Sequence, residues 1–226
     1  MTQGETSMNI EQARFNMVEQ QVRPWEVLDQ DVLDLLRQVR REDFVPEQYR
    51  ELAFSDMEIP LGHGEAMLSP KLEARMLQEV GVKATDQVLE VGTGSGYMTA
   101  LLARMANRGL VRSVEIIPEF SSRAAAILRE HGITNITLEV GDAARGWKQG
   151  GPYDVIVLTG SVPVLPEAFQ ADLKVGGRLF AVVGESPVME AHLITCVAKG
   201  VYRTTNLFET GVPPLKNAMQ PQRFVF

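Results

Sequence analysis

The sequence has 226 residues, of which 45% are hydrophobic and 23% charged, with 19 glycines, 12 prolines and one cysteine. A chain of this length and apolar content can bury the core of one domain, which argues against a disordered chain and a coiled coil. The formal net charge is −7, and no basic cluster is longer than Arg40-Arg41. We therefore expect neither nucleic acid nor an anionic membrane as the main partner.

The start of the sequence and its apolar runs carry no targeting or membrane signal. Residues 1–12 lack the basic and apolar regions of a secretory signal. Apolar runs such as 153–158 are far shorter than the roughly 20 residues of a membrane-spanning helix. Cys196 lies in an apolar run without a second thiol, which favours a core position in a reducing compartment. We therefore expect a cytoplasmic protein that does not bind membranes, and we favour a monomer.

Up to about residue 69 the sequence is charged and helix-like. Residues 9–24 predict one helix. A second, amphipathic helix is predicted behind a capping Asp29, because apolar residues follow at helical spacing. These residues are Val32, Leu35, Leu36 and Val39. Residues 43–70 hold too many turn residues for a long element and are a candidate for a loop that covers a site. We expect residues 9–69 to form a helical cap with a substrate loop.

From residue 69 onward helix and strand patterns alternate. Ser69 as N-cap and Pro70 at the first helical position predict a helix that Gly81 ends. Strands are predicted at 87–91, 110–116, 136–140, 153–158 and 178–183, and helices at 97–106, 119–130 and 166–173. This alternation indicates βαβ units, so we predict a doubly wound, mostly parallel α/β sheet with helices on both faces. Apolar stretches at 192–198 and 202–211 predict antiparallel strands at one edge. Residues 70–226 would then form the sheet, and 1–226 a single domain.

A glycine-rich turn joins the first strand of this sheet to a helix. The turn consists of Gly92, Thr93, Gly94, Ser95 and Gly96. Glycines let the backbone adopt positive φ and let a ligand approach the main chain. The spacing is G-x-G-x-G, whereas a dinucleotide loop has G-x-G-x-x-G with a third glycine where Tyr97 stands here. Glu90 would repel a pyrophosphate but attract a cation. The loop therefore predicts S-adenosylmethionine, a sulfonium nucleoside with an ammonium group, and disfavours a nicotinamide dehydrogenase.

Carboxylates also follow the next two predicted strands. Glu115 ends the second strand, where an acid can accept both ribose hydroxyls, and Ile116 offers an apolar face to a purine. Asp142 and Ala143 follow the third strand and could read an adenine amino group. Open α/β sheets bind ligands at the carboxyl ends of their strands. Alone, Glu115 could be a solvated strand end and Asp142 a turn residue; together with the loop they predict an adenosine site.

The chain from Met17 to about Leu215 resembles the protein-L-isoaspartate O-methyltransferases. The shared stretches read MVEQQVR, RREDFVP, AFSD, IPLGHG, LEVGTGSGYMTALLA, NITLEVGD, PYDVIVLTG and LKVGGRL. The resemblance implies a Rossmann-like methyltransferase sheet, S-adenosylmethionine as cofactor, and methyl transfer to a carboxylate of isoaspartyl residues in damaged peptides or proteins. It also implies that His63, Glu65 and Thr159 lie on the substrate side; for His63 a purely structural place in the loop is the alternative. No histidine has a partner at metal-ligand spacing, so we predict no metal.

One departure from the family pattern concerns the catalytic residue. The family reads roughly Q-T-I-S-Q-P where this sequence reads E-A-M-L-S-P. Ala66 therefore replaces a threonine, and Leu68 replaces the serine that lies beside the methyl donor. Ser69 is the neighbouring candidate, but it could serve only if the loop shifts register, and its other interpretation is a helix N-cap. The catalytic residue is left open.

A second departure concerns the acceptor. Glu65 replaces a neutral glutamine, and a carboxylate near the pocket would repel a carboxylate substrate. Two alternatives to the isoaspartyl activity follow. One is a divergent methyltransferase that acts on an amine, a hydroxyl or a smaller acid, including a small-molecule acceptor. The other is a protein that binds S-adenosylmethionine but has lost catalysis.

Overall fold

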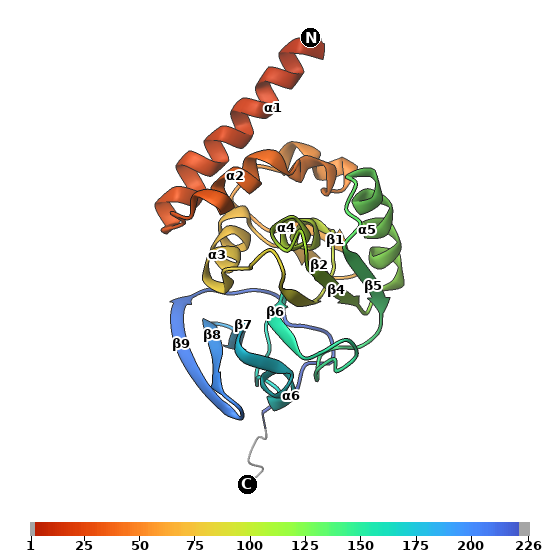
Figure 1. The fold of residues 1–226 in the computed structure, drawn as a ribbon. Helices are drawn as coiled ribbons and strands as arrows, with labels where there is room; N and C mark the ends of the chain where they lie inside the picture. The colour runs from red at the N-terminus through yellow and green to blue at the C-terminus, as the bar shows by residue number, and fades with distance from the viewer. Residues whose placement is uncertain (1–2, 222–226) are drawn as a thin grey trace. The chain divides into compact units, whose positions relative to one another are not determined.

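A computed structural model describes the backbone of residues 3–221 and the side chains from residue 9 onward. Its contacts divide the chain into two units, Met1–Gly81 and Val82–Phe226 (Figure 1). The division falls after helix α3 (Pro70–Val80), so this helix belongs to the first unit. The expectation that the whole chain forms one domain stays a prediction.

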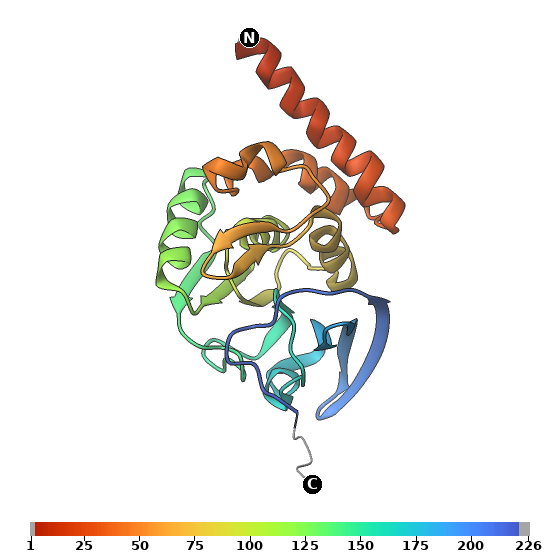
Figure 2. The same ribbon diagram turned by 180° about the vertical axis from the view of Figure 1, so that it is seen from behind.

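The first unit consists of helices, helical turns and one short hairpin. In chain order its elements are α1 (Gln3–Met17), η1 (Val18–Val22), η2 (Arg23–Trp25), α2 (Gln30–Gln38), η3 (Arg41–Asp43), η4 (Glu47–Leu52), β1 (Ile59–Gly62), β2 (Glu65–Met67) and α3. The helix expected over residues 9–24 is therefore α1 followed by a π-helical turn and a 3₁₀ turn. The β1–β2 hairpin, which Figure 2 shows, lies in the stretch for which we expected a loop.

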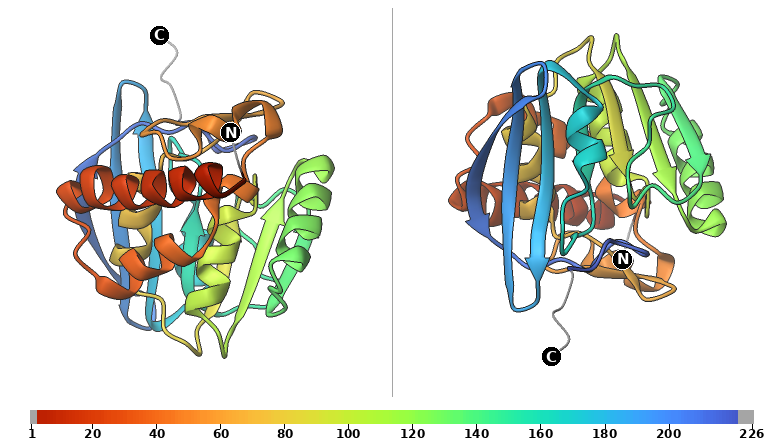
Figure 3. Two further views of the ribbon diagram at one scale, coloured as in Figure 1. Left: turned by 90° about the horizontal axis from the view of Figure 1, so that it is seen from above. Right: turned by 90° about the horizontal axis from the view of Figure 1, so that it is seen from below.

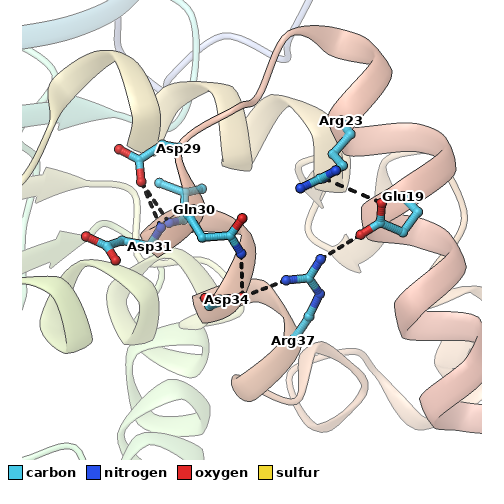
Figure 4. A network of polar contacts seen from close by, with 8 residues as sticks. Glu19, Arg23, Asp29, Gln30, Asp31, Asp34 and Arg37 are labelled. Atoms are coloured by element: carbon cyan, nitrogen blue, oxygen red, sulfur yellow. Dashed lines mark hydrogen bonds and ion pairs between the residues drawn. The ribbon is translucent and has the colours of Figure 1, made fainter.

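Helix α2 begins where the sequence predicted. The Oδ1 atom of Asp29 accepts from the backbone N–H groups of Asp31 at 2.9 Å and Val32 at 3.2 Å, so Asp29 is the N-cap. Arg37 then joins α2 to η1, because its guanidinium pairs with Asp34 and with Glu19, each at 2.6 Å. Figure 4 shows this network. The polar face of α2 is thus tied to the end of the first helix.

The second unit is built on a seven-stranded sheet with the order β5-β4-β3-β6-β7-β8-β9. The strands are β3 (Gln87–Val91), β4 (Leu110–Glu115), β5 (Ile136–Val140), β6 (Tyr153–Leu158), β7 (Leu173–Glu185), β8 (Val188–Ala198) and β9 (Val201–Glu209). The first five in this order pair in parallel, and β8 and β9 are antiparallel. The predicted doubly wound, mostly parallel sheet with antiparallel edge strands is confirmed.

Two strands, β7 and β8, begin before the residues that the sequence predicted, at Leu173 and Val188. β7 starts at Leu173, which pairs with Tyr153, whereas Val155 already pairs with Arg178. The extra residues form a bulge in which Gly176 has φ +82°. A strand with a bulge loses the regular alternation of apolar and polar residues. For this reason the sequence pattern placed the start of β7 at the end of the predicted helix 166–173.

Three helices pack on this sheet. α4 (Tyr97–Met105) and α5 (Pro118–Glu130) lie on one face, and α6 (Glu167–Ala171) lies on the other (Figure 3). The chain runs outward from β3 through β4 to β5 and then returns to the other side of β3 to form β6. The sheet therefore has a topological switch point between β3 and β6, the place where open α/β sheets bind ligands.

One hydrophobic core cluster of the second unit lies between the central strands and α6. It includes Leu89 and Ile156 from neighbouring strands and Phe169 from α6, all completely buried. Cys196 lies in this core with 2% of its surface exposed, as expected for a core residue. Among residues 3–221, no helix is both long and apolar enough to cross a membrane.

Candidate functional site

The glycine loop and Glu115 meet directly. β3 ends at Val91, and Gly92, Gly94 and Gly96 take the backbone through positive φ values of 97°, 53° and 85° into α4. The backbone N–H of Gly94 donates to Glu115 Oε2 at 2.8 Å, and the N–H of Ile117 donates to Oε1 at 2.9 Å. Glu115 is 5% exposed. Two groups predicted from separate parts of the sequence therefore form one structure at the ends of β3 and β4.

Thr159 closes the other side of the loop. Its hydroxyl points to the carbonyl oxygens of Val91 at 2.9 Å and Gly92 at 2.7 Å. A methyl group on Gly92 would overlap the Thr159 hydroxyl, so this close approach requires a glycine. Thr159 follows β6, and the contact therefore spans the switch point between β3 and β6. Its hydroxyl is directed at the loop, although the resemblance implied a position on the substrate side.

The polar side chains in and before the loop turn toward the protein. Thr93 and Ser113 share a hydrogen bond of 2.5 Å between their hydroxyls, and Ser95 Oγ accepts from the Tyr97 N–H at 3.2 Å. Glu90 is completely buried, and Thr99 of α4 donates to its Oε2 at 2.5 Å. The expected attraction of Glu90 for a cation would therefore act from within the protein and not through an exposed carboxylate.

Asp142 lies at the end of β5, beyond Glu115. Its Oδ1 accepts from the Ala144 N–H at 3.0 Å, and its Oδ2 accepts from the side-chain amide of Asn217 at 2.9 Å. The carboxylate is exposed, whereas the neighbouring Ala143 is buried. The backbone ties this corner to β4, because the Gly141 N–H donates to the Glu115 carbonyl at 2.9 Å. Ile116, next to Glu115, is half-buried.

Trp147 shapes the same corner and was not predicted. A methyl group on Gly141 would lie 2.7 Å from the Trp147 ring, so the indole packs on the glycine before Asp142. The indole N–H donates to Glu139 at 3.1 Å, and Glu139 pairs with Arg112. A tryptophan a few residues after a strand end is a signal that sequence reasoning could have used.

The segment after β9 also reaches this edge of the sheet, and sequence reasoning missed it. Residues 212–218, here called the strap, run back to β6, where Ser161 holds them. Ser161 is completely buried. Its N–H donates to the Pro213 carbonyl, its hydroxyl to the Val212 carbonyl, and its own carbonyl accepts from the Leu215 N–H, each at 2.9 Å. The strap is therefore fixed to the sheet within the second unit.

The strap also covers two glycines of the site. Methyl groups built on Gly92 and Gly160 would lie 3.8 and 2.8 Å from Cδ2 of Leu215. From there the strap continues to Asn217, which contacts Asp142. The strap thus links the end of β6 with the end of β5, and the glycine loop and Glu115 lie at the strands between them.

In the first unit, the predicted substrate-side residues lie on the β1–β2 hairpin. Pro60 pairs with Ala66, and Gly62 pairs with Glu65. His63 forms the exposed turn with a φ of +55°, a conformation that few residues other than glycine adopt. Glu65 and Ala66 are half-buried. This turn was missed because two glycines and a proline hide the short strand pattern.

Leu68, at the position of the family's serine, is held in place through its backbone. Its side chain is 5% exposed, and its carbonyl accepts from Nη2 of Arg41 at 2.6 Å. Arg41 is completely buried, donates to the Ala53 carbonyl at 2.9 Å and pairs with Glu73 of α3. Burial raises the pKa of Glu73 to about 7, although the Arg41 guanidinium acts to lower it.

Ser69 and Pro70 begin α3 as the sequence predicted. Ser69 occupies the N-cap position of α3, but its side chain makes no capping hydrogen bond. The predicted N-cap position is therefore confirmed, and the hydroxyl takes no part in the cap. Its carbonyl accepts from the N–H groups of Leu72 and Glu73 at 3.1 and 3.2 Å. With Leu68 held by Arg41 and Ser69 bound into α3, the segment is fixed against a one-residue shift.

No group of three or more histidine, cysteine, aspartate or glutamate side chains within the described residues is arranged to hold a metal ion. The groups that gather at the strand ends are instead backbone N–H donors, hydroxyls and carboxylates. Such a set suits an uncharged sugar and base next to a positive centre.

Comparison with known proteins gives consistent matches. The sequence model described as "Protein-L-isoaspartate(D-aspartate) O-methyltransferase (PCMT)" matches residues 12–210. Protein-L-isoaspartate O-methyltransferase 1 of Rhodopseudomonas palustris (strain HaA2) is 42% identical over 171 residues, covering 76% of this chain and 69% of the relative. The protein-L-isoaspartate O-methyltransferase of Opitutus terrae is 36% identical over 212 residues, covering 94% and 85%.

The fold is also similar to that of a solved structure. A Plasmodium falciparum protein described as a protein-L-isoaspartate O-methyltransferase, in complex with S-adenosyl-L-homocysteine, superposes with a TM-score of 0.78 at 22% identity. The match covers 89% of this chain and 97% of that chain. At this identity the likeness concerns the fold.

Proposed function

This chain belongs to the protein-L-isoaspartate O-methyltransferase family and is thus an S-adenosylmethionine-dependent methyltransferase, and we propose that its acceptor is the carboxylate of an isoaspartyl residue. The glycine loop braced by Glu115 and Thr159 at the switch point of the sheet supports the cofactor assignment, and the family match supports the acceptor. The acidic chain favours a protein or peptide substrate over nucleic acid. We place this activity in the cytoplasm and in a monomer.

The residues at the strand ends fit the proposed cofactor. Each oxygen of Glu115 accepts one backbone N–H and keeps a lone pair, so both remain available to ribose hydroxyls. Ile116 and Ala143 would contact the purine, and Asp142 would accept its amino group. The loop of Gly92, Thr93, Gly94, Ser95 and Gly96 would carry the methionine part close to the backbone, near the buried carboxyl group of Glu90.

When bound, S-adenosylmethionine would supply a methyl group on a positively charged sulfur; a carboxylate oxygen can accept this methyl group without a base, and the sulfur leaves as a neutral thioether. The work of the protein is therefore to position the acceptor and to exclude water. From the resemblance we assign contact with the acceptor to His63, to Glu65 and to the segment that ends at Ser69, whereas the Thr159 hydroxyl is directed at the glycine loop. Arg41 fixes this segment through the Leu68 carbonyl.

The hydroxyl beside the acceptor is assigned to Ser69. Leu68 is buried and offers no polar atom from its side chain. The Ser69 hydroxyl makes no capping hydrogen bond with α3, so it is available to a substrate without cost to the helix. Because the register is fixed, Ser69 cannot take the place of the family's serine at Leu68, so we propose that its hydroxyl contacts the acceptor from its own position and not by the shift considered above.

A second candidate function keeps the cofactor and changes the acceptor. Glu65 and Leu68 together favour it, because one places a negative charge and the other an apolar surface where the family has a neutral amide and a hydroxyl. An amine, a hydroxyl compound or a smaller acid would then be methylated. A chain that binds the cofactor without turnover is the remaining alternative.

Transfer of a labelled methyl group to an isoaspartyl peptide, compared with the aspartyl peptide of the same sequence, tests the acceptor. We expect transfer to the isoaspartyl peptide alone, and at least a tenfold loss in Ser69→Ala. Inactive wild type with activity gained in Leu68→Ser, but not in Leu68→Ala, would establish the divergent function. Inactivity of all forms toward both peptides would contradict the isoaspartyl proposal.

Direct binding tests the cofactor assignment separately. Glu115→Ala removes two charge-assisted hydrogen bonds from the loop and the ribose site, so we expect the Kd for S-adenosylhomocysteine to rise about 100-fold. Glu119→Ala is the matched control, because Glu119 is exposed in the first turn of α5. Calorimetry measures both, and equal affinities of the two variants would refute the assignment.

A further inference from the structure

Asp142 is held by two donors that come from distant parts of the chain. The Ala144 N–H binds Oδ1 at 3.0 Å, and this bond is local. The second donor, Nδ2 of Asn217, binds Oδ2 at 2.9 Å across 75 positions of sequence. A carboxylate with one fixed donor on each oxygen cannot turn freely about its Cβ–Cγ bond. Its remaining lone pairs therefore keep constant directions.

The strap presents Asn217 in a defined place. Leu215 is fixed two residues earlier by its N–H bond to Ser161 and by its contact at Gly160. The Ala218 N–H then donates to the Leu215 carbonyl at 3.2 Å and closes a turn in which Asn217 has a φ of +61°. A positive φ at the third position of a turn favours glycine or asparagine. The turn alone would thus accept either residue, but only asparagine supplies the amide.

Building on the cofactor site proposed above, we propose that Asn217 is a positioning residue for adenine recognition, acting through Asp142. The amide holds the Asp142 carboxylate so that an unused lone pair faces the amino group of the base. Hypoxanthine has a carbonyl oxygen in place of that amino group. In such a base the carbonyl oxygen would face the Asp142 carboxylate, and because both groups are hydrogen-bond acceptors they would repel each other. A fixed carboxylate penalises this mismatch more than a mobile one, because it cannot turn away.

Asn217→Gly separates this role from the turn. Glycine keeps the positive φ and removes only the amide, so the strap and its bonds to Ser161 are retained. The matched control is Asn206→Ala in β9. Asn206 also donates its side-chain amide to a carboxylate, Glu190 Oε2 at 3.0 Å, within the same unit, but it plays no part in the proposed site.

The test compares the Kd values of S-adenosylhomocysteine and S-inosylhomocysteine, measured by calorimetry for the wild type and both variants. We expect the wild type to prefer the adenosyl ligand. In Asn217→Gly, binding of S-adenosylhomocysteine should weaken about three- to tenfold, as for the loss of one hydrogen bond. The ratio of the two Kd values should fall at the same time, while Asn206→Ala keeps the wild-type values.

The ratio distinguishes positioning from a general effect on the fold. A purely structural role of Asn217 would weaken both ligands equally and leave the ratio unchanged, which would overturn the inference. An Asn217→Gly variant with wild-type affinities would overturn it as well. Equal binding of both ligands by the wild type would refute base recognition by Asp142, and with it this inference. Absence of S-adenosylhomocysteine binding in the wild type would instead contradict the proposed function itself.

A double substitution supplies an independent readout. If Asn217 acts through Asp142, Asn217→Gly should have no further effect on the Kd ratio in an Asp142→Ala background. Additive effects of the two substitutions would contradict the inference.

Discussion

Gly109 and Gly211 differ in the space available to a side chain. Neither has a positive φ, so alanine suits both backbones. A methyl group on Gly109 would overlap the backbone oxygen of Asp86, whereas nothing lies within 4 Å of one on Gly211. Backbone atoms cannot move aside as the end of a side chain can. We expect Gly109→Ala to lower the free energy of unfolding by about 1–3 kcal/mol.

Urea denaturation measures this difference, and Gly211→Ala is the control. Its free energy of unfolding should stay within about 0.5 kcal/mol of the wild type. Equal stability of the two variants would show that the turn before β4 can rearrange.

At the same scale, the meeting of Glu115 with the glycine loop could be predicted and the contact of Asp142 with Asn217 could not. The first follows from topology, because the carboxyl ends of neighbouring parallel strands lie side by side. The contact of Asp142 with Asn217 joins a strand end to a residue whose sequence context indicates only a turn. The two positions are 75 residues apart, and no sequence periodicity links them. The N-cap position of Ser69 could also be predicted from the sequence, but the direction of its hydroxyl could not, because that direction depends on three-dimensional packing.

Among the elements, α3 carries a buried charge whose state depends on pH. Burial raises the pKa of Glu73 from its ordinary value of 4.5 to about 7, against the opposing effect of Arg41. Between these two pH values the folded chain keeps a proton on Glu73 that the unfolded chain has lost. Raising the pH through this range therefore lowers the contribution of Glu73 to stability, by about 3 kcal/mol in all.

The variant Glu73→Gln removes this titration. We expect its free energy of unfolding, relative to that of the wild type, to increase from pH 4.5 to pH 7 and to level off above. Urea denaturation at a series of pH values measures the difference. Glu51 is exposed, and Glu51→Gln serves as the control: its free energy of unfolding should change with pH in the same way as that of the wild type. If the free energy of unfolding of Glu73→Gln also changed with pH as that of the wild type does, Glu73 would ionise at its ordinary pKa in the folded chain.

The elements themselves show where sequence patterns suffice. β3, β5 and β6 have the predicted bounds, because short apolar runs between turn residues leave little choice. The β1–β2 hairpin was missed because its strands are too short to show alternation, and β7 was shortened because a bulge interrupts it. Regular strands could thus be predicted from the sequence, whereas the very short hairpin and the bulged strand could not.

For the whole molecule, the single-domain prediction requires that the two units unfold together. The chain has two tryptophans, and Trp25 lies in the first unit and Trp147 in the second. The variants Trp25→Phe and Trp147→Phe each leave one probe. If the chain is a single domain, as its sequence predicts, both probes should report one urea transition with the same midpoint.

Ligand binding sharpens the same measurement. S-adenosylhomocysteine at 100 times its Kd should raise the free energy of unfolding by about 2.7 kcal/mol. In a single cooperative domain both probes should report this increase. A shift seen only by Trp147 would show that the units are independent and would contradict the single-domain prediction.

The bonds between Ser161 and the strap also affect how the end of the chain exchanges its amide protons. Terminal segments usually exchange within the dead time of an experiment, because they open without disturbing anything else. Here the Leu215 N–H is bonded to a completely buried residue at the end of a central strand. Its deuterium uptake should be as slow as that of the sheet interior, so residues close to the C-terminus report on global opening of the second unit.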